Sequence, residues 1–367
     1  MVISILWYTV SMPSKTKKIN IAILAPVFLP IPPKKQGGSE WIVYHQANGL
    51  VDLGFNVTLF AVAKSKTKAT LIPVVQKGVQ DYSIKLDAME SSRKLRLENV
   101  FIARLLTQLM KHKNTFDIIF NHTRGGEIML PLTKYIKAPM VHVLHLPLFK
   151  DVADIYQQYQ APLVSISNNQ RKGFEKLNYA GTVYNGVDTS RFTFNQKPKD
   201  YIFCIATIGE HKNTLDAVIA AKKSQTKLIL AGKIRDQDYY EKKIKPHIDG
   251  KKVQYKGEVG FKEKIKLYRN AKALLFPTKW QEPFGLVAIE ALACGTPVIA
   301  YHNGALPEIV QHGKNGFLVK QVTGIVSAIK KIYKIDRADC RKSVEKKFTI
   351  KKMVKDYAQI CRDLTSV

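Results

Sequence analysis

Residues 272–301, KALLFPTKWQEPFGLVAIEALACGTPVIAY, predict the basic unit of this fold. The apolar runs ALLFPT and TPVIAY are continuous, as is typical of strands that are buried on both faces of a parallel sheet. Between them we expect a helix that begins near Phe284, runs through Glu290 and ends at Gly295. The stretch therefore predicts a strand, a crossover helix and a second, parallel strand.

Similar apolar runs recur along the whole chain. After the first run and a loop over residues 27–40, Trp41, Val43, Tyr44, Ala47 and Leu50 are spaced so that they share one face of a helix. Two series of such strands, each with crossover helices, predict an α/β fold with two doubly wound, Rossmann-like domains facing each other across a cleft. The other runs are KINIAILAP, NVTLFAV, FDIIFNH, PMVHVLH and APLVSIS in the first half, and YIFCIAT, TKLILAG and KVQYKG in the second.

The chain divides into four predicted segments. Residues 1–18 are expected to be an N-terminal extension, because the first strand begins only at Ile19 and Met12 could equally begin the protein. Residues 19–184 and 199–345 are the two predicted domains, and the turn-rich sequence YNGVDTSRFTFNQKP (184–198) marks the seam. Residues 346–367 are predicted to be terminal helices. The apolar run over residues 2–10 is too short to span a bilayer.

The composition is strongly basic. The chain has 58 Lys and Arg against 29 Asp and Glu, a net charge of +29, and only 11 of the 58 are Arg. Such an excess suggests nucleic acid, an anionic membrane or a phosphorylated small molecule as partner, while a compositional bias toward lysine is an equal rival. Residues 1–170 contribute +10 and residues 171–367 contribute +19, without a basic tail or a stripe interleaved with aromatics. This spread argues against a specific nucleic-acid partner.

The sequence gives little support for a metal or a cofactor. Cys204, Cys294, Cys340 and Cys361 stand far apart without a CxxC pair, which argues against a zinc site or a disulfide framework and favours a reducing cytosol. Residues 236–238 form a DxD sequence, which binds divalent metals in some enzymes but is common by chance. We therefore expect no metal site and no cofactor.

Several polar or glycine-rich segments follow the ends of predicted strands. They are His122, His145, the Gly37–Gly38 loop, Thr207 to Asn213, and Glu282 to Gly285. In doubly wound sheets the ligand binds beyond the carboxyl ends of the strands. These segments are therefore expected to converge on the cleft between the domains.

Glu282 and Glu290 carry the most specific chemical signal. Glu282 lies just before the predicted helix and Glu290 about two turns into it. A helix N-terminus suits a diphosphate, and Gly285 lets the backbone approach an anion closely. Glu290 lies among apolar residues, so its charge needs a partner. That partner is either a pair of sugar or ribose hydroxyls or a neighbouring Lys in a structural ion pair.

Residues 282–310, EPFGLVAIEALACGTPVIAYHNGALPEIV, resemble the E-x7-E signature of retaining glycosyltransferases of family four, which have the GT-B fold. The resemblance covers nearly the whole chain. KINIAILAP with GGSEW resembles the opening strand and glycine-rich loop of that family, and YNGVDTSRF resembles its domain-junction motif. FTIKKMVKDYAQICRDL resembles its terminal helices, which cross back onto the first domain.

The resemblance implies transfer of a hexosyl group from a UDP- or GDP-linked sugar to a hydroxyl of a lipid, glycan or small molecule. Glu290 would then accept the ribose hydroxyls, and Glu282 would hold hydroxyls of the transferred sugar as an orienting residue. Backbone N–H groups of Phe284, Gly285 and Leu286 would hold the distal phosphate and the sugar.

The remaining roles fall on both domains. Gly37 and Gly38 correspond to the loop that closes over the diphosphate, and Lys212 to the lysine that neutralises it. His122 corresponds to a histidine close to the transferred sugar. His145 corresponds to a second one near the acceptor, although a structural histidine at a strand end is as good an interpretation. The implied catalytic set is His122, Glu282 and Lys212.

One position departs from the family pattern. The family usually has G-R-L ahead of the lysine, where this chain has Ala206, Thr207 and Ile208. Thr207 can give one neutral hydrogen bond to the donor, whereas Arg offers a charged fork. The alternative to an enzyme is therefore a catalytically weak nucleotide-sugar-binding or scaffold protein. A nicotinamide or ATP site is poorly supported, because GGSEW is neither GxGxxG nor a P-loop.

The expected site needs few cations, so most of the lysines are surplus to it. Their best functional use is adhesion of a cytoplasmic protein to the anionic inner face of a membrane, where a lipid-linked acceptor could lie. Liposome sedimentation with and without anionic lipid would distinguish adhesion from compositional bias.

Overall fold

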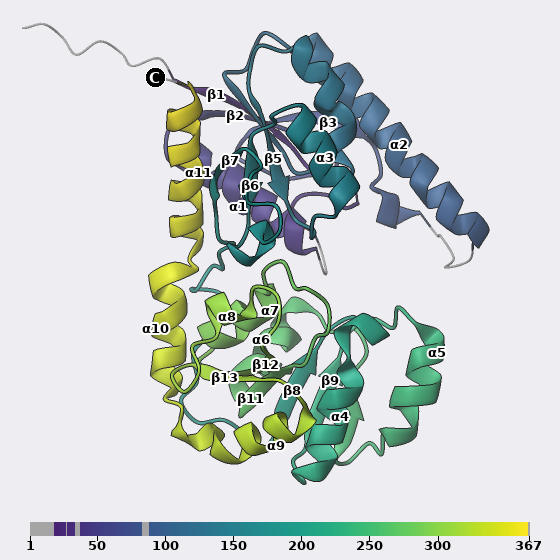
Figure 1. Cartoon of the computed structure of the whole chain (residues 1–367), viewed down its shortest axis with the longest axis vertical. Coiled ribbons are helices and arrows are strands. Elements are labelled where there is room, and N and C mark those ends of the chain that lie inside the picture. The colour runs from purple at the N-terminus through teal and green to yellow at the C-terminus, as the bar shows by residue number, and fades with distance from the viewer. Residues whose placement is uncertain (1–17, 27, 34–36, 83–87, 366–367) are drawn as a thin grey trace, which may run out of the picture.

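The computed structural model describes residues 18–26, 28–33, 37–82 and 88–365. The predicted N-terminal extension, including Met12, lies outside the described residues except for Lys18. The chain forms two α/β domains, one above the other in Figure 1, each built on a parallel sheet with helices packed against it. The fold class predicted from the sequence is therefore confirmed.

The first domain contains a seven-stranded sheet with the order β3-β2-β1-β4-β5-β6-β7. All of its neighbouring strands pair in parallel. Its helices are α1 (Gly38–Asp52), α2 (Ala88–Lys111) and α3 (Lys150–Gln158). The strands are β1 (Asn20–Leu24), β2 (Asn56–Val62), β3 (Thr70–Val75), β4 (Ile118–Asn121), β5 (Met140–Leu144), β6 (Leu163–Ser165) and β7 (Tyr179–Thr182).

The second domain contains a six-stranded parallel sheet with the order β10-β9-β8-β11-β12-β13. The strands are β8 (Ile202–Ile205), β9 (Leu228–Ala231), β10 (Val253–Tyr255), β11 (Ala273–Phe276), β12 (Val298–Tyr301) and β13 (Gly316–Val319). The helices are α4 (Thr214–Lys223), α5 (Gln237–Tyr239), α6 (Phe261–Asn270), α7 (Leu286–Ala293), α8 (Leu306–Ile309) and α9 (Val322–Lys331).

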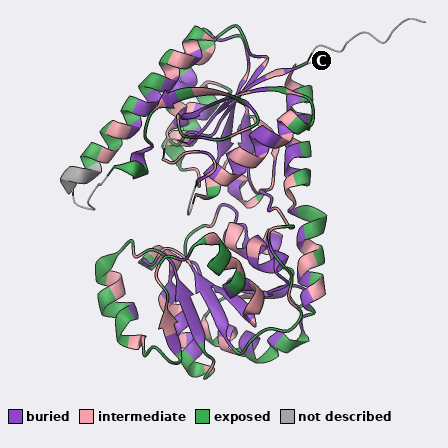
Figure 2. Ribbon diagram, turned by 180° about the vertical axis from the view of Figure 1, so that it is seen from behind, coloured by how far each residue is buried: buried purple, intermediate pink, exposed green. Residues whose placement is uncertain are grey.

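Three strands, β3, β7 and β13, have no counterpart among the predicted runs. Each lies at the edge of its sheet and is only partly buried. An edge strand faces solvent on one side, so its sequence lacks the continuous apolar run that marks a central strand. Figure 2 shows the contrast, since the central strands of both sheets are mostly buried.

The strand orders fix where a ligand can bind. The order reverses direction between β1 and β4 in the first sheet and between β8 and β11 in the second. At such a switch point the loops after adjacent strands diverge and leave a crevice at their carboxyl ends. The loops that follow these four strands contain the Gly37–Gly38 segment, His122, Thr207 and Glu282.

Two further helices end the chain, α10 (Arg337–Lys347) and α11 (Ile350–Thr365). Helix α10 packs against α7 of the second domain, and α11 lies along α1 of the first domain (Figure 1). Within the described residues, the predicted segment of terminal helices, 346–367, contains α11 and only the last two residues of α10, and α11 is the helix that packs on the first domain. At Gly49 of α1, a Cβ atom would lie 2.5 Å from Cγ2 of Val354, so glycine is needed for this close packing.

The position of α11 also changes which face of α1 is buried. Val43, Ala47 and Leu50 are buried as expected, but Trp41 and Tyr44 are only half-buried. The buried face extends instead to residues such as Gln46, because α1 is covered by the sheet on one side and by α11 on another.

The two places where the chain passes between the domains lie side by side. Val187 and Thr349 form a parallel bridge, with the Val187 N–H donating to the Phe348 carbonyl at 2.8 Å. A second contact joins the domains at α8, where the Glu308 carboxylate accepts hydrogen bonds from the backbone N–H groups of Asn168 and Asn169 at 2.9 and 2.7 Å. These contacts hold the switch points of the two sheets opposite each other.

No helix in the described part of the chain combines the length and the apolarity needed to cross a membrane.

Candidate active site

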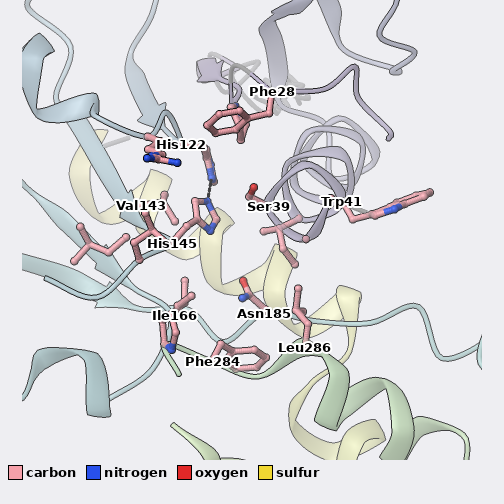
Figure 3. Close-up of a pocket in the computed structure, with 18 of the residues that line it drawn as sticks. Phe28, Ser39, Trp41, His122, Val143, His145, Ile166, Asn185, Phe284 and Leu286 are labelled. Atoms are coloured by element: carbon pink, nitrogen blue, oxygen red, sulfur yellow. Dashed lines mark hydrogen bonds between the residues drawn. The ribbon is translucent and has the colours of Figure 1, made fainter. Parts of the chain in front are cut away.

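A cavity of about 1040 Å³ lies between the domains at the switch points of both sheets. Figure 3 shows Phe28, His122 and His145 on its first-domain side and Phe284 and Leu286 on the opposite side. The structure brings every candidate residue of the sequence analysis to this cavity. The lining includes Gly37, Gly38, His122, His145, Thr207, Lys212, Glu282, Phe284, Gly285, Leu286 and Glu290.

Helix α7 presents its N-terminus to the cavity. It begins at Leu286 and ends at Ala293, so the predicted bounds near Phe284 and at Gly295 are each too wide. The reason is local, because Gly285 and Gly295 both have positive φ, 113° and 81°, which lie outside the helical region. No side chain caps the helix start, which leaves its N–H groups and dipole end available to an anion.

Glu282 and Lys212 form an ion pair beside this helix start. Lys212 Nζ lies 2.7 Å from Glu282 Oε2, and both side chains are largely buried. The loop of Glu282 is held by Gly304, where φ is 55° and a Cβ would lie 2.4 Å from the Glu282 nitrogen. The role of Gly304 could not be predicted from the sequence, because nothing in its spacing indicates so close a contact.

Glu290 is held by two residues of α6. Lys264 Nζ lies 2.7 Å from Glu290 Oε1, and the Tyr268 hydroxyl donates to Glu290 Oε2 at 2.9 Å. Burial, together with the charge of Glu290, raises the pKa of Tyr268 well above its ordinary value, so it stays a donor. Of the two partners considered for Glu290, the lysine is therefore present. Lys264 and Tyr268 are four positions apart, a spacing that places them on one helix face.

The glycine-rich loop reaches across the cleft. A Cβ atom on Gly38 would lie 2.9 Å from Cδ1 of Leu286, the first residue of α7. A Cβ on Gly37 would lie 2.7 Å from Cγ of Pro33. Glycine at position 38 therefore allows the first domain to pack close to the start of α7, and glycine at position 37 avoids a clash within the loop itself.

Two histidines of the first domain contact each other. His122 Nδ1 lies 2.9 Å from His145 Nε2, as the dashed line in Figure 3 marks. Burial lowers the pKa of His145 to about 4, and burial together with His145 holds the pKa of His122 well below its ordinary value. Both rings are therefore neutral near pH 7, with one nitrogen of the contact donating and the other accepting.

We expect stability to fall as the pH drops from about 6.5 to about 4. In the unfolded chain a histidine takes up its proton near pH 6.5. In the folded state, burial lowers the pKa of His142, which lies on β5, to about 3. The pKa values of His145 and His122 are lowered by burial as well. Within this window the unfolded state binds more protons, so each such histidine lowers the free energy of unfolding by up to about 1.4 kcal/mol per pH unit. Above pH 6.5 the three contribute no pH dependence.

Urea unfolding midpoints at several pH values between 7.5 and 4.5 test this expectation. Carboxylates also titrate at the acidic end, so the matched variant is His142→Phe, which keeps a ring beside Tyr156, 5.1 Å away. Between pH 6.5 and 4.5, the slope of its free energy of unfolding against pH should correspond to the uptake of about one proton fewer on unfolding than in the wild type. Identical pH dependence in the two proteins would contradict the assignment.

Thr207 lines the cavity, and the nearby positive charge comes from other positions. Arg191, which no sequence motif indicated as a site residue, lies between Trp41 of α1 and Phe261 of α6, with its guanidinium 4.8 and 4.2 Å from the two ring centroids. Arg191 lines the cavity, as do Lys212 and Lys264. Its position within the junction motif gave no indication of this stack, which joins residues of three separate segments.

The DxD sequence has local partners. The Asp236 carboxylate caps α5 by accepting from the Tyr239 N–H at 2.9 Å, and Asp238 lies 3.5 Å from Lys242. In the ranges that the structure describes, no three His, Cys, Asp or Glu side chains are grouped so that they could hold a metal ion.

Two family models match the chain. The model described as Glycosyltransferase Family 4 matches residues 36–191, and the model described as Glycosyl transferases group 1 matches residues 188–347. Together they extend from residue 36 to residue 347 and include both sides of the cavity.

Curated relatives match over shorter stretches. Glycogen synthase of Mycobacterium tuberculosis is 28% identical over 162 residues, which are 41% of this chain and 39% of that protein. The probable sucrose-phosphate synthase of Thermosipho melanesiensis is 29% identical over 185 residues, 47% of this chain and 43% of that protein. The chain thus spans about two fifths of the length of these relatives.

Solved structures match over nearly the whole chain. Sucrose-phosphate synthase from Thermosynechococcus elongatus has a TM-score of 0.77 at 18% identity, covering 95% of this chain and 100% of that one. AviGT4, a glycosyltransferase involved in avilamycin A biosynthesis, has a TM-score of 0.70 at 21% identity, with coverages of 95% and 98%. Anabaena HepE in complex with UDP and glucose has a TM-score of 0.72 at 16% identity, with coverages of 95% and 100%. At these identities the likeness shows the two-domain GT-B fold.

Proposed function

Because this chain belongs to the glycosyltransferases of the group 1 and family 4 models, we propose that it is a retaining hexosyltransferase that uses a UDP- or GDP-linked sugar. The acceptor in this proposal is a hydroxyl group. The observation that carries the proposal is the convergence of two carboxylate–lysine pairs, Glu282–Lys212 and Glu290–Lys264, on one cavity beside the open start of α7. A nucleotide sugar has matching groups, namely a diphosphate between two sets of hydroxyls.

In each pair, a bound donor can replace the ion-pair partner of the lysine and of the glutamate. When the donor binds, it separates Lys212 from Glu282. Lys212 then neutralises a phosphate of the donor, and Glu282 accepts hydrogen bonds from the sugar hydroxyls. Glu290, farther along α7, accepts the ribose hydroxyls in the same way. HepE, one of the structural neighbours, is described in complex with UDP and glucose, and this supports UDP-glucose as the first donor to test.

The proposed reaction needs no protein nucleophile. As the bond between the anomeric carbon and the diphosphate breaks, negative charge grows on the leaving phosphate. Lys212 and the N–H groups at the start of α7 stabilise that charge where it develops. The acceptor oxygen bonds to the anomeric carbon on the face that the phosphate leaves, and its proton passes to a phosphate oxygen. Glu282 orients the sugar, and neutral His122 lies on the first-domain side of the cavity.

We expect Glu290→Gln to weaken binding of the nucleotide-sugar donor about tenfold or more. The substitution keeps the shape of the side chain but removes its charge, and hydrogen bonds to a charged acceptor are roughly twice as strong as those to a neutral one. A thermal-shift titration with a panel of nucleotide sugars measures the change and also identifies the base and sugar.

The matched control is Glu345→Gln, which removes another carboxylate paired with a basic side chain, Arg341, outside the cavity. It should leave the donor titration unchanged. Equal donor affinity of Glu290→Gln and the wild type would overturn the ribose role of Glu290.

The second candidate function is nucleotide-sugar binding without turnover. It is favoured by Thr207, which lines the cavity. The family pattern has an arginine at this position, and that arginine would bind the diphosphate together with the lysine, whereas Thr207 carries no charge. Incubation with radiolabelled donors separates the two candidates. Hydrolysis or transfer of the label supports the enzyme, and saturable binding of an intact donor supports the scaffold.

A further inference from the structure

The first-domain part of the cavity is lined by exposed apolar side chains. Leu95, Ile128, Leu146 and Phe149 all line it, and each is at least half exposed, with values from 50 to 59%. They come from α2, from the segment after β4 and from the segment after β5, so only the tertiary fold brings them to one cavity. We call these four residues the apolar subsite.

Clustered, exposed apolar side chains are uncommon on soluble proteins and usually mark a binding site. The second-domain side of the same cavity is polar, with Lys212, Glu282, Lys264 and Glu290. The first-domain side combines the apolar subsite with polar residues such as Glu98, Asn99 and Glu127. An occupant of the apolar subsite therefore shares one cavity with the proposed donor.

The backbone beneath the apolar subsite is anchored. The Gln170 side-chain amide donates to the carbonyls of Leu144 and Leu146, both at 2.8 Å. Asn121 donates to the Gly126 carbonyl at 3.3 Å, and a Cβ on Gly126 would lie 2.6 Å from Asn121 Nδ2. The backbone near Leu146 and Ile128 is therefore fixed by hydrogen bonds, which favours a preformed site for a ligand.

Two cations stand at the edge of this region. Lys94 Nζ and the Arg124 guanidinium each lie 5.7 Å from the centroid of the Phe28 ring. Within the described ranges neither of them is in an ion pair with a carboxylate. Lys94 comes from α2, Arg124 follows β4, and both Phe28 and Arg124 line the cavity. Glu98, which is buried, and Glu127 line the cavity as well, so charge complementarity favours an anionic group on the ligand only at the Phe28 edge, beside the two cations.

We propose that the acceptor is an anionic amphiphile, with an alkyl chain on the apolar subsite, an anionic group beside Lys94 and Arg124, and a hydroxyl that reaches the donor. This inference rests on the proposed function and names the acceptor class of the same site. The hydroxyl oxygen of this acceptor bonds to the anomeric carbon of the donor sugar, and the bond from that carbon to the diphosphate breaks. The hydroxyl proton passes to the departing phosphate.

Binding of three matched compounds to the full chain, measured by calorimetry below their micelle concentrations, tests the proposal. Octanoyl-lysophosphatidylglycerol has the chain, the anion and the hydroxyls. Glycerophosphoglycerol lacks the chain, and monooctanoylglycerol lacks the anion. We expect the first to bind at least tenfold more tightly than the second and at least threefold more tightly than the third at low salt. Equal affinity with and without the chain would overturn the apolar subsite, and equal affinity with and without the anion would overturn the role of the two cations.

A substitution places the binding on the named residues. Ile128→Ser should reduce the advantage of the octanoyl chain at least fivefold, and folding should be preserved because the side chain is 56% exposed. Tyr333→Ser, which removes a 78% exposed apolar side chain that does not line the cavity, should leave the advantage unchanged. An unchanged chain advantage in Ile128→Ser would contradict the proposal.

Turnover with UDP- and GDP-hexoses separates this inference from the proposed function. Chain-dependent binding without any transfer or hydrolysis would overturn the enzyme and leave the apolar subsite supported. Transfer to glycerophosphoglycerol as efficient as transfer to the octanoyl compound would support the enzyme and overturn the amphiphile.

Discussion

Lys212→Ala should lower kcat for donor turnover by about 10²- to 10³-fold, the usual cost of removing one preorganised group that stabilises a developing negative charge. Lys212 is the last residue of a short helical turn (Glu210–Lys212), and its backbone is fixed by Asn213, whose side chain donates to the Pro277 carbonyl at 3.1 Å. The lysine is therefore positioned by its loop as well as by Glu282. With Thr207 uncharged, we expect no neighbouring side chain to replace it fully.

The control for this variant is Lys272→Ala, which removes a lysine that also forms an ion pair, with Asp200, in the same domain but outside the cavity. It should change neither kcat nor the unfolding midpoint appreciably, since exposed ion pairs contribute little. Steady-state kinetics and urea unfolding of both variants separate catalysis from folding. If Lys212→Ala loses stability in proportion to its activity, the ion pair with Glu282 is structural and the catalytic role is wrong.

Arg337→Met should destabilise the second domain by about 3–5 kcal/mol, the range for leaving buried polar groups without their partner. Arg337 is buried, and it donates to the carbonyls of Asn195, Ala271 and Arg269 at 2.6, 2.9 and 2.8 Å. It also donates to the Thr296 hydroxyl at 2.8 Å. Burial lowers its pKa to about 10, yet it remains charged at neutral pH. Methionine fills part of the volume but satisfies none of these oxygens.

The urea midpoint, followed by circular dichroism, measures this loss. Lys342→Met introduces the same side chain on the same helix, α10, at a position where the lysine is mostly exposed. It should stay within about 0.5 kcal/mol of the wild type. A similar midpoint for the two variants would show that Arg337 contributes no more than a surface residue.

The central strands could be predicted because burial on both faces leaves a clear pattern. Strands β1, β2, β8, β9, β11 and β12 all fall within continuous apolar runs of the sequence. Of the four edge strands, β10 falls within the predicted run KVQYKG, but β3, β7 and β13 could not be predicted, since a half-exposed strand such as β7 has the mixed composition of a loop. The predicted bounds of α7 were too wide, because helical spacing does not show where a helix begins or ends. Helical spacing extends past Gly285, but only the backbone conformation shows where the helix begins.

For the candidate site, the sequence predicted which segments of the chain meet at the cavity. His122 and Glu282 were chosen because they follow strand ends, and both line the cavity. Their partners were not predictable. The contact between His122 and His145, the stack of Arg191 between two aromatic rings, and the apolar subsite all join side chains from separate elements.

The sequence by itself therefore determined the two parallel-sheet domains and the edge of each sheet at which the cavity lies. Continuous apolar runs are stable only when both faces are covered, and parallel strands bring their carboxyl ends to one edge. The tertiary structure alone decided that Glu290 meets Lys264, that Glu282 meets Lys212, and that the four residues of the apolar subsite line one cavity. A hydrogen bond or ion pair requires atoms within about 3 Å of each other, and the periodicity of a sequence carries no information at that precision between elements far apart in the chain.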